Sequence, residues 1–487
     1  MKKNNILKVV LISLGVAVLL SWLFNTTTFQ VELVEDGPNQ VGLFGLFSDM
    51  TSVASYFAHV LLYLFAVGAF YAVLHSIPGY RNLLDKIVKS FKGKEWLFIV
   101  ISIALVAVMT AMARMGIAVV FVFPLIAAII LLMGYDKITV ALVTAGAVAV
   151  GLMGTVFSMP ILETQSDVPH QLMSTSILKD VLNNLEVAKG VDVAGPVAEW
   201  GVKLAILAIG IAILAFNTIK HAKKVRDTKN IEASSLVPEA TATKKKESWL
   251  PLAIIFDLTL LVMILSFMSW SNVFEKTWFV DITESVMSLK VGEFPIFQKI
   301  LGFVPAFGNW TLNELVVLLF VSALVIAFIY RVKTSDFIEN IVAGVKAALK
   351  PALVVLLIYV VMVIALDSNY ILTIVKPILT LSKGFNVATM SIAAFLTSFL
   401  GVEMFFASPV VLDYAVSLTD GTNLPLIAII WQSMNGLAML VAPTSVVLMG
   451  TLAYLKVPYG SWLKASWKVL VEILVALLII FLLMLML

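Results

Sequence analysis

The chain has 487 residues, of which 61% are hydrophobic and 13% charged, and its net charge is +3. This composition excludes a soluble globular protein, and so small a net charge gives no reason to expect a nucleic-acid partner. The absence of cysteine excludes disulfides, thiol catalysis and cysteine-ligated metals.

Many apolar runs are long enough to cross the roughly 30 Å hydrocarbon core of a bilayer, and helices satisfy their own backbone in lipid. We therefore expect an all-α polytopic membrane protein. Lysine and arginine mark the cytoplasmic ends of the spans. The basic N-terminus predicts a cytoplasmic start and a retained first span that ends near Leu23, an acidic outer loop at 25–50, a span at 51–76 and a basic amphipathic surface helix at 81–94.

Residues 97–135 form an almost unbroken apolar run of 39 residues, about 58 Å if helical. No single span is that long, and both ends border cytoplasmic signals. We predict a re-entrant hairpin that enters from the cytoplasm and turns near Arg114-Met115-Gly116. A broken span at 138–160, an outer insert at 161–197 and a closing span at 199–217 follow.

The second half repeats this plan upside down. A basic linker precedes an extra span at 250–270. After this additional crossing the chain is on the outer side, so the second copy begins outside and has the opposite orientation to the first. The predicted elements of that copy are a span at 311–330, an amphipathic inner segment at 334–349, a span at 351–366, a hairpin at 386–418 that turns near Gly401 and Glu403, a span at 424–446 broken at Asn435-Gly436 and Pro443-Thr444-Ser445, and a last span.

The resulting fold consists of two inverted-topology repeats, each with a re-entrant hairpin and a broken transmembrane helix. This arrangement is typical of secondary transporters, in which the broken helices mark the binding site. The predicted divisions are a first repeat at 1–217, a cytoplasmic linker at 218–248, an extra helix with an outer insert at 249–310, and a second repeat at 311–487.

Each half contains one ionisable residue inside an apolar run, Arg114 in the first half and Glu403 in the second. A charge at bilayer depth costs a few kcal/mol and persists where it faces a cavity or a partner. Arg114 suits a substrate carboxylate because guanidinium offers a charged bidentate fork; the alternatives are an ion pair with Glu403 or a snorkelling side chain. Glu403 would bind a substrate amine, carry a coupled proton, or neutralise Arg114. The two together favour a zwitterion such as an amino acid.

The other candidate substrate-binding residues flank these two or lie at the predicted breaks, where backbone groups and hydroxyls are exposed to a ligand. The alternatives are ordinary helix packing through small residues and, for the polar pair at 432 and 435, a helix–helix hydrogen bond. These residues are Met115, Gly116, Gly154, Thr155, Ser158, Ser398, Gly401, Gln432, Asn435, Gly436, Pro443, Thr444 and Ser445.

The stretches Ala442–Leu452 and Val457–Lys464, with the Gly134–Thr139 turn and the Met115-Gly116 pair, carry a family resemblance. The chain resembles the YfcC-type members of the C4-dicarboxylate anaerobic carrier (DcuC-type) family of the ion-transporter superfamily. The resemblance implies an elevator-type carrier, a homodimer, and a place in the bacterial cytoplasmic membrane. It also implies dicarboxylates or exchanged basic amino acids as substrates.

The chain departs from the family pattern at the residues that decide specificity. Relatives tend to have acids just after the Met-Gly pair, where Ile117 and Ala118 stand here, and an acid where Asn435 stands. Such replacements should change the substrate or the coupling ion, so substrate specificity does not transfer from the family.

We expect a secondary active transporter for a small carboxylate-bearing solute, an amino acid ahead of a C4-dicarboxylate or other organic anion. The sequence has no Walker motif, so a gradient of Na⁺ or H⁺, or exchange, must drive transport. We expect no cofactor, no metal site and no enzymatic activity. A membrane enzyme would need clustered catalytic groups near one membrane face, and a channel would need polar periodicity along whole helices.

Two substitutions test the roles of Arg114 and Glu403. Arg114→Ala should abolish binding of anionic ligands, because it removes the guanidinium, and Glu403→Gln should alter the pH or cation dependence of transport. Uptake into proteoliposomes measures both effects. Unchanged transport in both variants would remove these residues from the mechanism.

Overall fold

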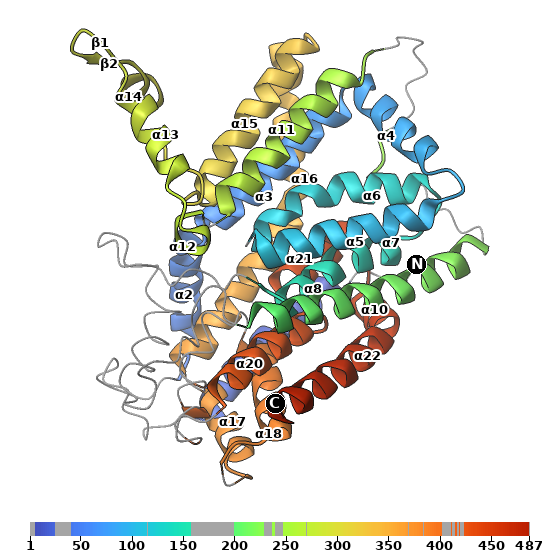
Figure 1. The fold of residues 1–487 in the computed structure, drawn as a ribbon, viewed down its shortest axis with the longest axis vertical. Coiled ribbons are helices and arrows are strands. Elements are labelled where there is room, and N and C mark those ends of the chain that lie inside the picture. The colour runs from blue at the N-terminus through green and yellow to red at the C-terminus, as the bar shows by residue number, and fades with distance from the viewer. Residues whose placement is uncertain are drawn as a thin grey trace.

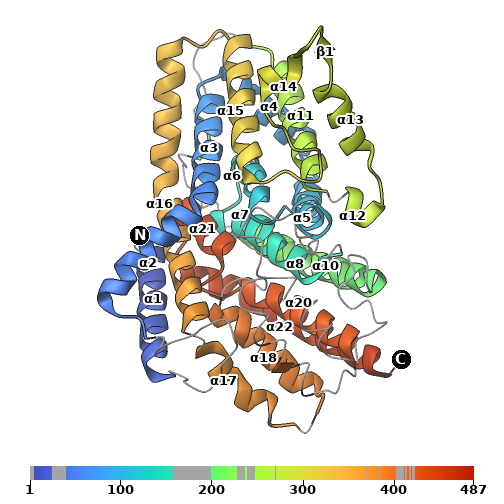
Figure 2. The same cartoon turned by 90° about the vertical axis from the view of Figure 1, so that its left-hand side faces the viewer.

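The computed structural model describes residues 5–24, 40–113, 115–156, 199–227, 236–238, 247–268, 270–368, 370–382, 384–401, 411, 414–415, 418 and 423–486. This part of the chain is almost entirely helical, and eight of its helices are long and apolar enough to cross a membrane. The helices form two contiguous groups that meet along one interface (Figures 1 and 2).

The first group surrounds α3 and α16. Helix α3 packs against α15 and α16, α1 packs against α16, and α11 packs against α15. A Cβ on Gly68 would lie 2.6 Å from the Gly344 carbonyl oxygen, so two glycines let the α3 and α16 backbones touch. The group contains α1 (Ile6–Leu23), α2 (Leu43–Tyr56), α3 (Ala58–His75), α11 (Leu250–Phe267), α15 (Leu312–Ile329) and α16 (Thr334–Asp367), with α4 (Pro78–Ser90) between the groups.

The second group contains both predicted hairpin regions and both predicted broken spans. Helix α8 packs against α5 and α20, and α20 packs against α18 and α22. Its members are α5 (Glu95–Met112), the 3₁₀ helix η1 (Gly116–Val122), α6 (Phe123–Leu132), α7 (Lys137–Ala141), the π-helical turn η2 (Leu142–Gly146), α8 (Ala147–Met153), α10 (Trp200–Asp227), α17 (Tyr370–Leu379), α18 (Val387–Gly401), α20 (Leu424–Met439), α21 (Val446–Leu455) and α22 (Tyr459–Met486).

The break inside the long apolar run agrees with the sequence. Helix α5 ends at Met112, and the chain resumes as η1 at Gly116, whose φ of +39° suits glycine. Two phenols of α3 hold η1 in place: the Tyr63 hydroxyl donates to the Ala118 carbonyl at 2.5 Å, and the Tyr71 hydroxyl donates to the Phe121 carbonyl at 2.7 Å. Arg114 lies outside the described residues.

The first broken span agrees with the sequence in part. Helix α8 ends at Met153, and Gly154 and Thr155 are no longer helical. The π-helical turn at Leu142–Gly146 is a second irregularity that the sequence did not predict. Ser158 lies outside the described residues.

One predicted break in the second half is wrong. Helix α20 runs without interruption through Asn435 and Gly436, and the chain breaks only at residues 440–445 around Pro443. A Cβ on Gly436 would lie 2.7 Å from the Ala149 carbonyl oxygen and would collide with the Met153 backbone. This glycine therefore brings α20 against α8 and does not unwind its own helix.

The structure also joins two elements that the sequence divided, the amphipathic inner segment at 334–349 and the span at 351–366. The structure has one continuous helix, α16, with Pro351 inside it. The residues before the proline, around Gly344 and Ala348, pack against α3. This tertiary packing outweighs the tendency of proline to break a helix.

Two predicted loops also contain helix. Helix α2 occupies part of the expected outer loop, and α10 extends ten residues into the expected linker, to Asp227. The second arm of the hairpin at 386–418 falls mostly outside the described residues. The inversion of the second repeat relative to the membrane stays a prediction.

The turn between α6 and α7 is fixed by Asp136, which caps α7. Its carboxylate accepts hydrogen bonds from the Thr139 backbone at 2.9 Å and hydroxyl at 2.6 Å, and lies 3.2 Å from His221 Nε2 on α10. Burial tends to raise the pKa of Asp136, but the His221 and Thr139 hydrogen bonds outweigh it and hold the pKa below its ordinary value. The carboxylate thus ties the turn to α10.

Gly436→Ala should lower the thermal unfolding midpoint of the purified protein, because the added methyl group collides with the α8 backbone; overpacking of this kind costs about 1–3 kcal/mol. Gly460→Ala is the matched control, since a Cβ at Gly460 has no neighbour within 4 Å. Equal midpoints for the two variants would contradict the close α8–α20 contact.

Candidate functional site

A cavity of about 220 Å³ lies where the turn before η1 meets the break before α21. Met115 and Gly116 reach it from the turn, Asn435 from α20, and Ser445 from the break. These four predicted site residues come from segments more than 300 residues apart in the sequence, and the fold brings them together around one space.

Asn435 is the most informative residue of the cavity. Its side chain is only 6% exposed, and its Oδ1 atom has no hydrogen-bond partner among the described residues. A buried acceptor without a partner costs about 1–3 kcal/mol, and in native proteins it usually has a ligand, a water or an ion to pair with. Asn435 also lines the cavity, so this residue is a candidate partner for a donor group of a ligand.

The N-terminus of α21 lies beside this acceptor. Residues 446–448, the first turn of α21, line the cavity, and the N-cap residue Ser445 makes no side-chain capping bond. The first N–H groups of a helix lack intrahelical partners and carry a partial positive charge, which attracts anions. The cavity thus combines an acceptor on α20 with an electropositive helix end.

Gln432 connects the two broken spans. Its Nε2 donates to the Met153 carbonyl at 3.1 Å and to the Thr155 carbonyl at 3.0 Å, both at the end of α8. The Thr155 hydroxyl bonds back to the Gly151 and Leu152 carbonyls of its own helix. Gln432 therefore makes the interhelical hydrogen bonds that the sequence left as an alternative, and it satisfies carbonyls that the break exposes.

The break before α21 is tied to the end of α18. The Thr444 hydroxyl donates to the Phe399 carbonyl at 2.9 Å, next to Ser398 and two residues before Gly401. Ser398 and Gly401 are both buried in the last turn of α18. Pro443 lies within the non-helical stretch at 440–445, and Glu403 lies outside the described residues.

Two of the predicted site glycines serve packing in this structure. Gly436 touches α8, and a Cβ on Gly154 would lie 2.6 Å from the Leu207 Cβ of α10. Neither residue lines the cavity. The sequence pattern that marked them, glycine beside hydroxyl residues in an apolar run, is shared by binding sites and by close helix contacts.

Three residues of the first helix group close the cavity, and sequence reasoning missed them. They are Phe267 at the end of α11, Leu312 at the start of α15, and Tyr359 on α16. The Tyr359 ring is stacked on Phe57 with 3.8 Å between centroids and 8° between planes. An aromatic residue within an apolar span carries no sequence signal for this position, because lipid-facing and packing residues look the same.

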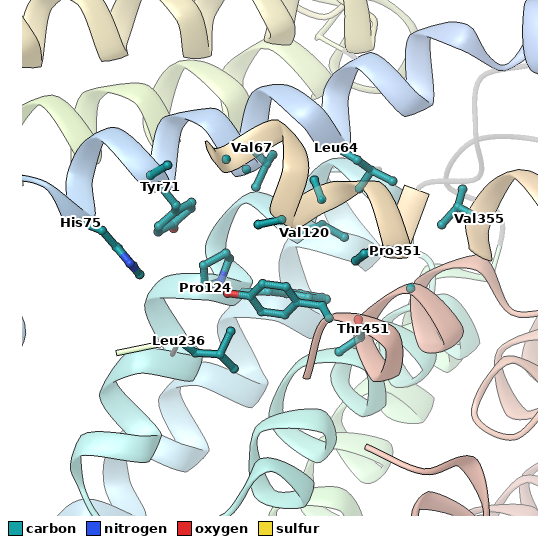
Figure 3. Close-up of a pocket in the computed structure, with 18 of the residues that line it drawn as sticks. Leu64, Val67, Tyr71, His75, Val120, Pro124, Leu236, Pro351, Val355 and Thr451 are labelled. Atoms are coloured by element: carbon teal, nitrogen blue, oxygen red, sulfur yellow. The ribbon is translucent and has the colours of Figure 1, made fainter. Parts of the chain in front are cut away.

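A larger cavity of about 450 Å³ lies elsewhere along the interface between the two groups. Figure 3 shows Val67 and Tyr71 of α3 on one side, and Leu236 of the linker with Thr451 of α21 on the other. None of the predicted site residues lines it, and its walls, like those of the smaller cavity, are mostly apolar. The larger cavity also contains polar side chains, among them His75 and Asn340.

The helices define a polytopic membrane protein, and the smaller cavity is a candidate ligand site between its two helix groups. A model of the family described as "C4-dicarboxylate anaerobic carrier" (DcuC) matches residues 36–162 and 189–487. The chain belongs to this family and is a membrane carrier.

Other comparisons add little to this assignment. The YdaH transporter of Alcanivorax borkumensis is 11% identical, with a TM-score of 0.43, over 98% of this chain and 96% of that chain. A likeness of this degree supports no argument about the site. No curated protein matches the chain in sequence.

Thr444→Val should destabilise the protein by about 1 kcal/mol, because it removes the donor to the Phe399 carbonyl. The thermal unfolding midpoint of the ligand-free protein measures the loss. Thr444→Ser keeps the hydroxyl and is expected to stay close to the parent. A Val variant as stable as the Ser variant would show that this hydrogen bond does not hold the break.

Proposed function

We propose that this carrier moves a small carboxylate-bearing solute across the membrane and binds it in the 220 Å³ cavity, with an amino acid as the first candidate. The volume is below the roughly 300 Å³ at which pockets for drug-sized ligands begin, which suits a solute of metabolite size. The observation that carries the proposal is that Asn435, whose Oδ1 has no hydrogen-bond partner among the described residues, lines this cavity together with the first turn of α21.

The chemistry of the two groups favours a zwitterion. A carboxylate suits the electropositive end of α21, and an ammonium group is the kind of donor that Asn435 Oδ1 lacks. Arg114 immediately precedes Met115, a cavity residue, and its proposed role at a substrate carboxylate comes from the sequence. The role of Glu403 rests on the sequence alone.

A C4-dicarboxylate is the second candidate, and the family description favours it. A dicarboxylate would need donors at both ends. The Asn435 amide can supply one if it turns its NH₂ group into the cavity, because an amide presents either its oxygen or its nitrogen. Competition between the two solute classes in one assay decides between them.

We infer an elevator-type movement from the composition of the cavity wall. Tyr359, Phe267 and Leu312 belong to the first helix group, while the turn before η1, α20 and the break before α21 belong to the second. A slide of the second group along the first would carry the solute away from these three residues and open the site on the other side. A gradient of Na⁺ or H⁺, or exchange against a related solute, would supply the energy.

The remaining parts of the proposal come from the sequence. We propose that the carrier works as a homodimer in a bacterial cytoplasmic membrane, with its N-terminus in the cytoplasm. The positive charges of the N-terminus and the linker support this orientation.

Counter-flow in proteoliposomes tests the proposed function. Vesicles loaded with unlabelled amino acid or C4-dicarboxylate should accumulate the labelled solute transiently from outside, because a carrier exchanges across the membrane. Thermal-shift measurements with and without Na⁺ identify the ligand, since binding to the folded state raises the melting temperature. Flux without trans-stimulation by any solute that binds would point to a channel.

Asn435→Ala should weaken binding of the transported solute about tenfold, corresponding to the roughly 1.4 kcal/mol of one lost hydrogen bond to a charged group. Isothermal titration measures the affinity. Asn340→Ala is the matched control, because Asn340 lines the larger cavity and not the smaller one. If Asn340→Ala weakens binding and Asn435→Ala does not, the solute binds in the larger cavity.

A further inference from the structure

The segment between α11 and α15 forms an arm, defined here as residues 270–310. Figure 1 shows it leaving the end of α11 and pointing away from the helical body. From residue 274 to residue 311, all of which the structure describes, no residue is buried. The arm contains α12 (Trp270–Phe274), α13 (Trp278–Met287), β1 (Lys290–Val291), β2 (Phe294–Pro295) and α14 (Ile296–Leu301).

The base of the arm is fixed to α11. The Gly308 backbone N–H donates to the Ser266 carbonyl at 2.8 Å, and Gly308 adopts a φ of +103° close to the Met268 carbonyl. Trp270 Nε1 donates to the Leu265 carbonyl at 2.8 Å. The ring of Phe279 lies 5.1 Å from that of Trp270 and 5.3 Å from that of Phe307. These contacts give α13 a defined orientation.

The outward side of α13 is apolar. Trp278, Ile282 and Val286 recur every four residues and share one face of the helix, and Trp278 and Ile282 are 60% and 56% exposed. Glu284 lies on the opposite face of the same helix, because two residues rotate a helix by about 200°. Beyond the strands, α14 exposes Ile300 and Leu301. Contiguous exposed apolar surface of this kind marks an interaction site.

The position of the arm identifies what covers this surface. The arm begins and ends at membrane-spanning helices, α11 and α15, whose outward apolar side chains, such as Leu258 and Phe320, are half exposed and contact lipid in a membrane carrier. The apolar surface of the arm continues that lipid-facing surface past the ends of the spans. Trp278 and several phenylalanines suit the boundary between water and acyl chains.

The charges of the arm show what kind of contact to expect. It carries three lysines and four acidic residues, and so has almost no net charge. Basic amphipathic helices are attracted to anionic lipid, whereas this one has to rely on its apolar face. We propose that the arm is a membrane-surface anchor, with the Ile282 face of α13 immersed in the acyl boundary at the end of α11.

The absence of native cysteine makes the test direct, because any introduced cysteine is unique. Ile282→Cys and the control Glu284→Cys would be spin-labelled in the full-length protein and reconstituted into phosphatidylcholine vesicles. The label at 282 should be reached by oxygen and shielded from a water-soluble nickel complex. The label at 284 should show the reverse.

Three outcomes would overturn the proposal. If the nickel complex reaches both labels equally, the arm lies in water. If the label at 282 shows spin–spin broadening that disappears on dilution with unlabelled protein, a second copy of the chain covers the face instead of lipid. Replacing a third of the phosphatidylcholine with phosphatidylglycerol should leave the accessibility at 282 unchanged, and a clear dependence on anionic lipid would contradict an apolar anchor.

Discussion

Every interruption of a helix inside a membrane exposes backbone carbonyls and N–H groups that lipid cannot satisfy, so partners must come from the protein itself. In the described residues, side chains of the second half supply these partners, both to the first half and within the second half. Gln432 on α20 donates to the carbonyls at the end of α8, and Thr444 in the second break donates to the end of α18. The breaks that build the site also bind its segments together.

The exception to this pairing is the basis of the proposed function. Asn435 lies one helical turn from Gln432 on α20 and lines the cavity, yet its acceptor oxygen has no partner among the described residues. One face of a single helix therefore satisfies the neighbouring backbone at one position and carries an unpaired acceptor at the next. Gly436, the next residue, permits the contact with α8 that fixes this geometry.

The sequence predicted the features that depend on local chemistry. Glycine, proline and hydroxyl residues in apolar runs located the turn at residues 115–116 and the breaks at Gly154 and Pro443, because these residues weaken helices wherever they occur. The same rule failed at Gly436, where contact with α8 decides the outcome. Tyr359 could not have been predicted as a cavity residue, since its position depends on which helices of the first group meet the second.

The two tyrosines of α3 set a condition on any movement of the second helix group. The Tyr63 and Tyr71 hydroxyls are bonded to carbonyls on successive turns of η1. Tyr71 borders the larger cavity, but Tyr63 is fully buried. The Tyr63 hydroxyl therefore finds no water when it leaves its carbonyl, so intermediate positions are penalised. A 3₁₀ helix repeats every three residues, or about 6 Å, and a shift by that distance presents the next carbonyl to the same hydroxyl. Displacement along α3 would then proceed in discrete registers, and the activation barrier between registers would limit the speed of each cycle.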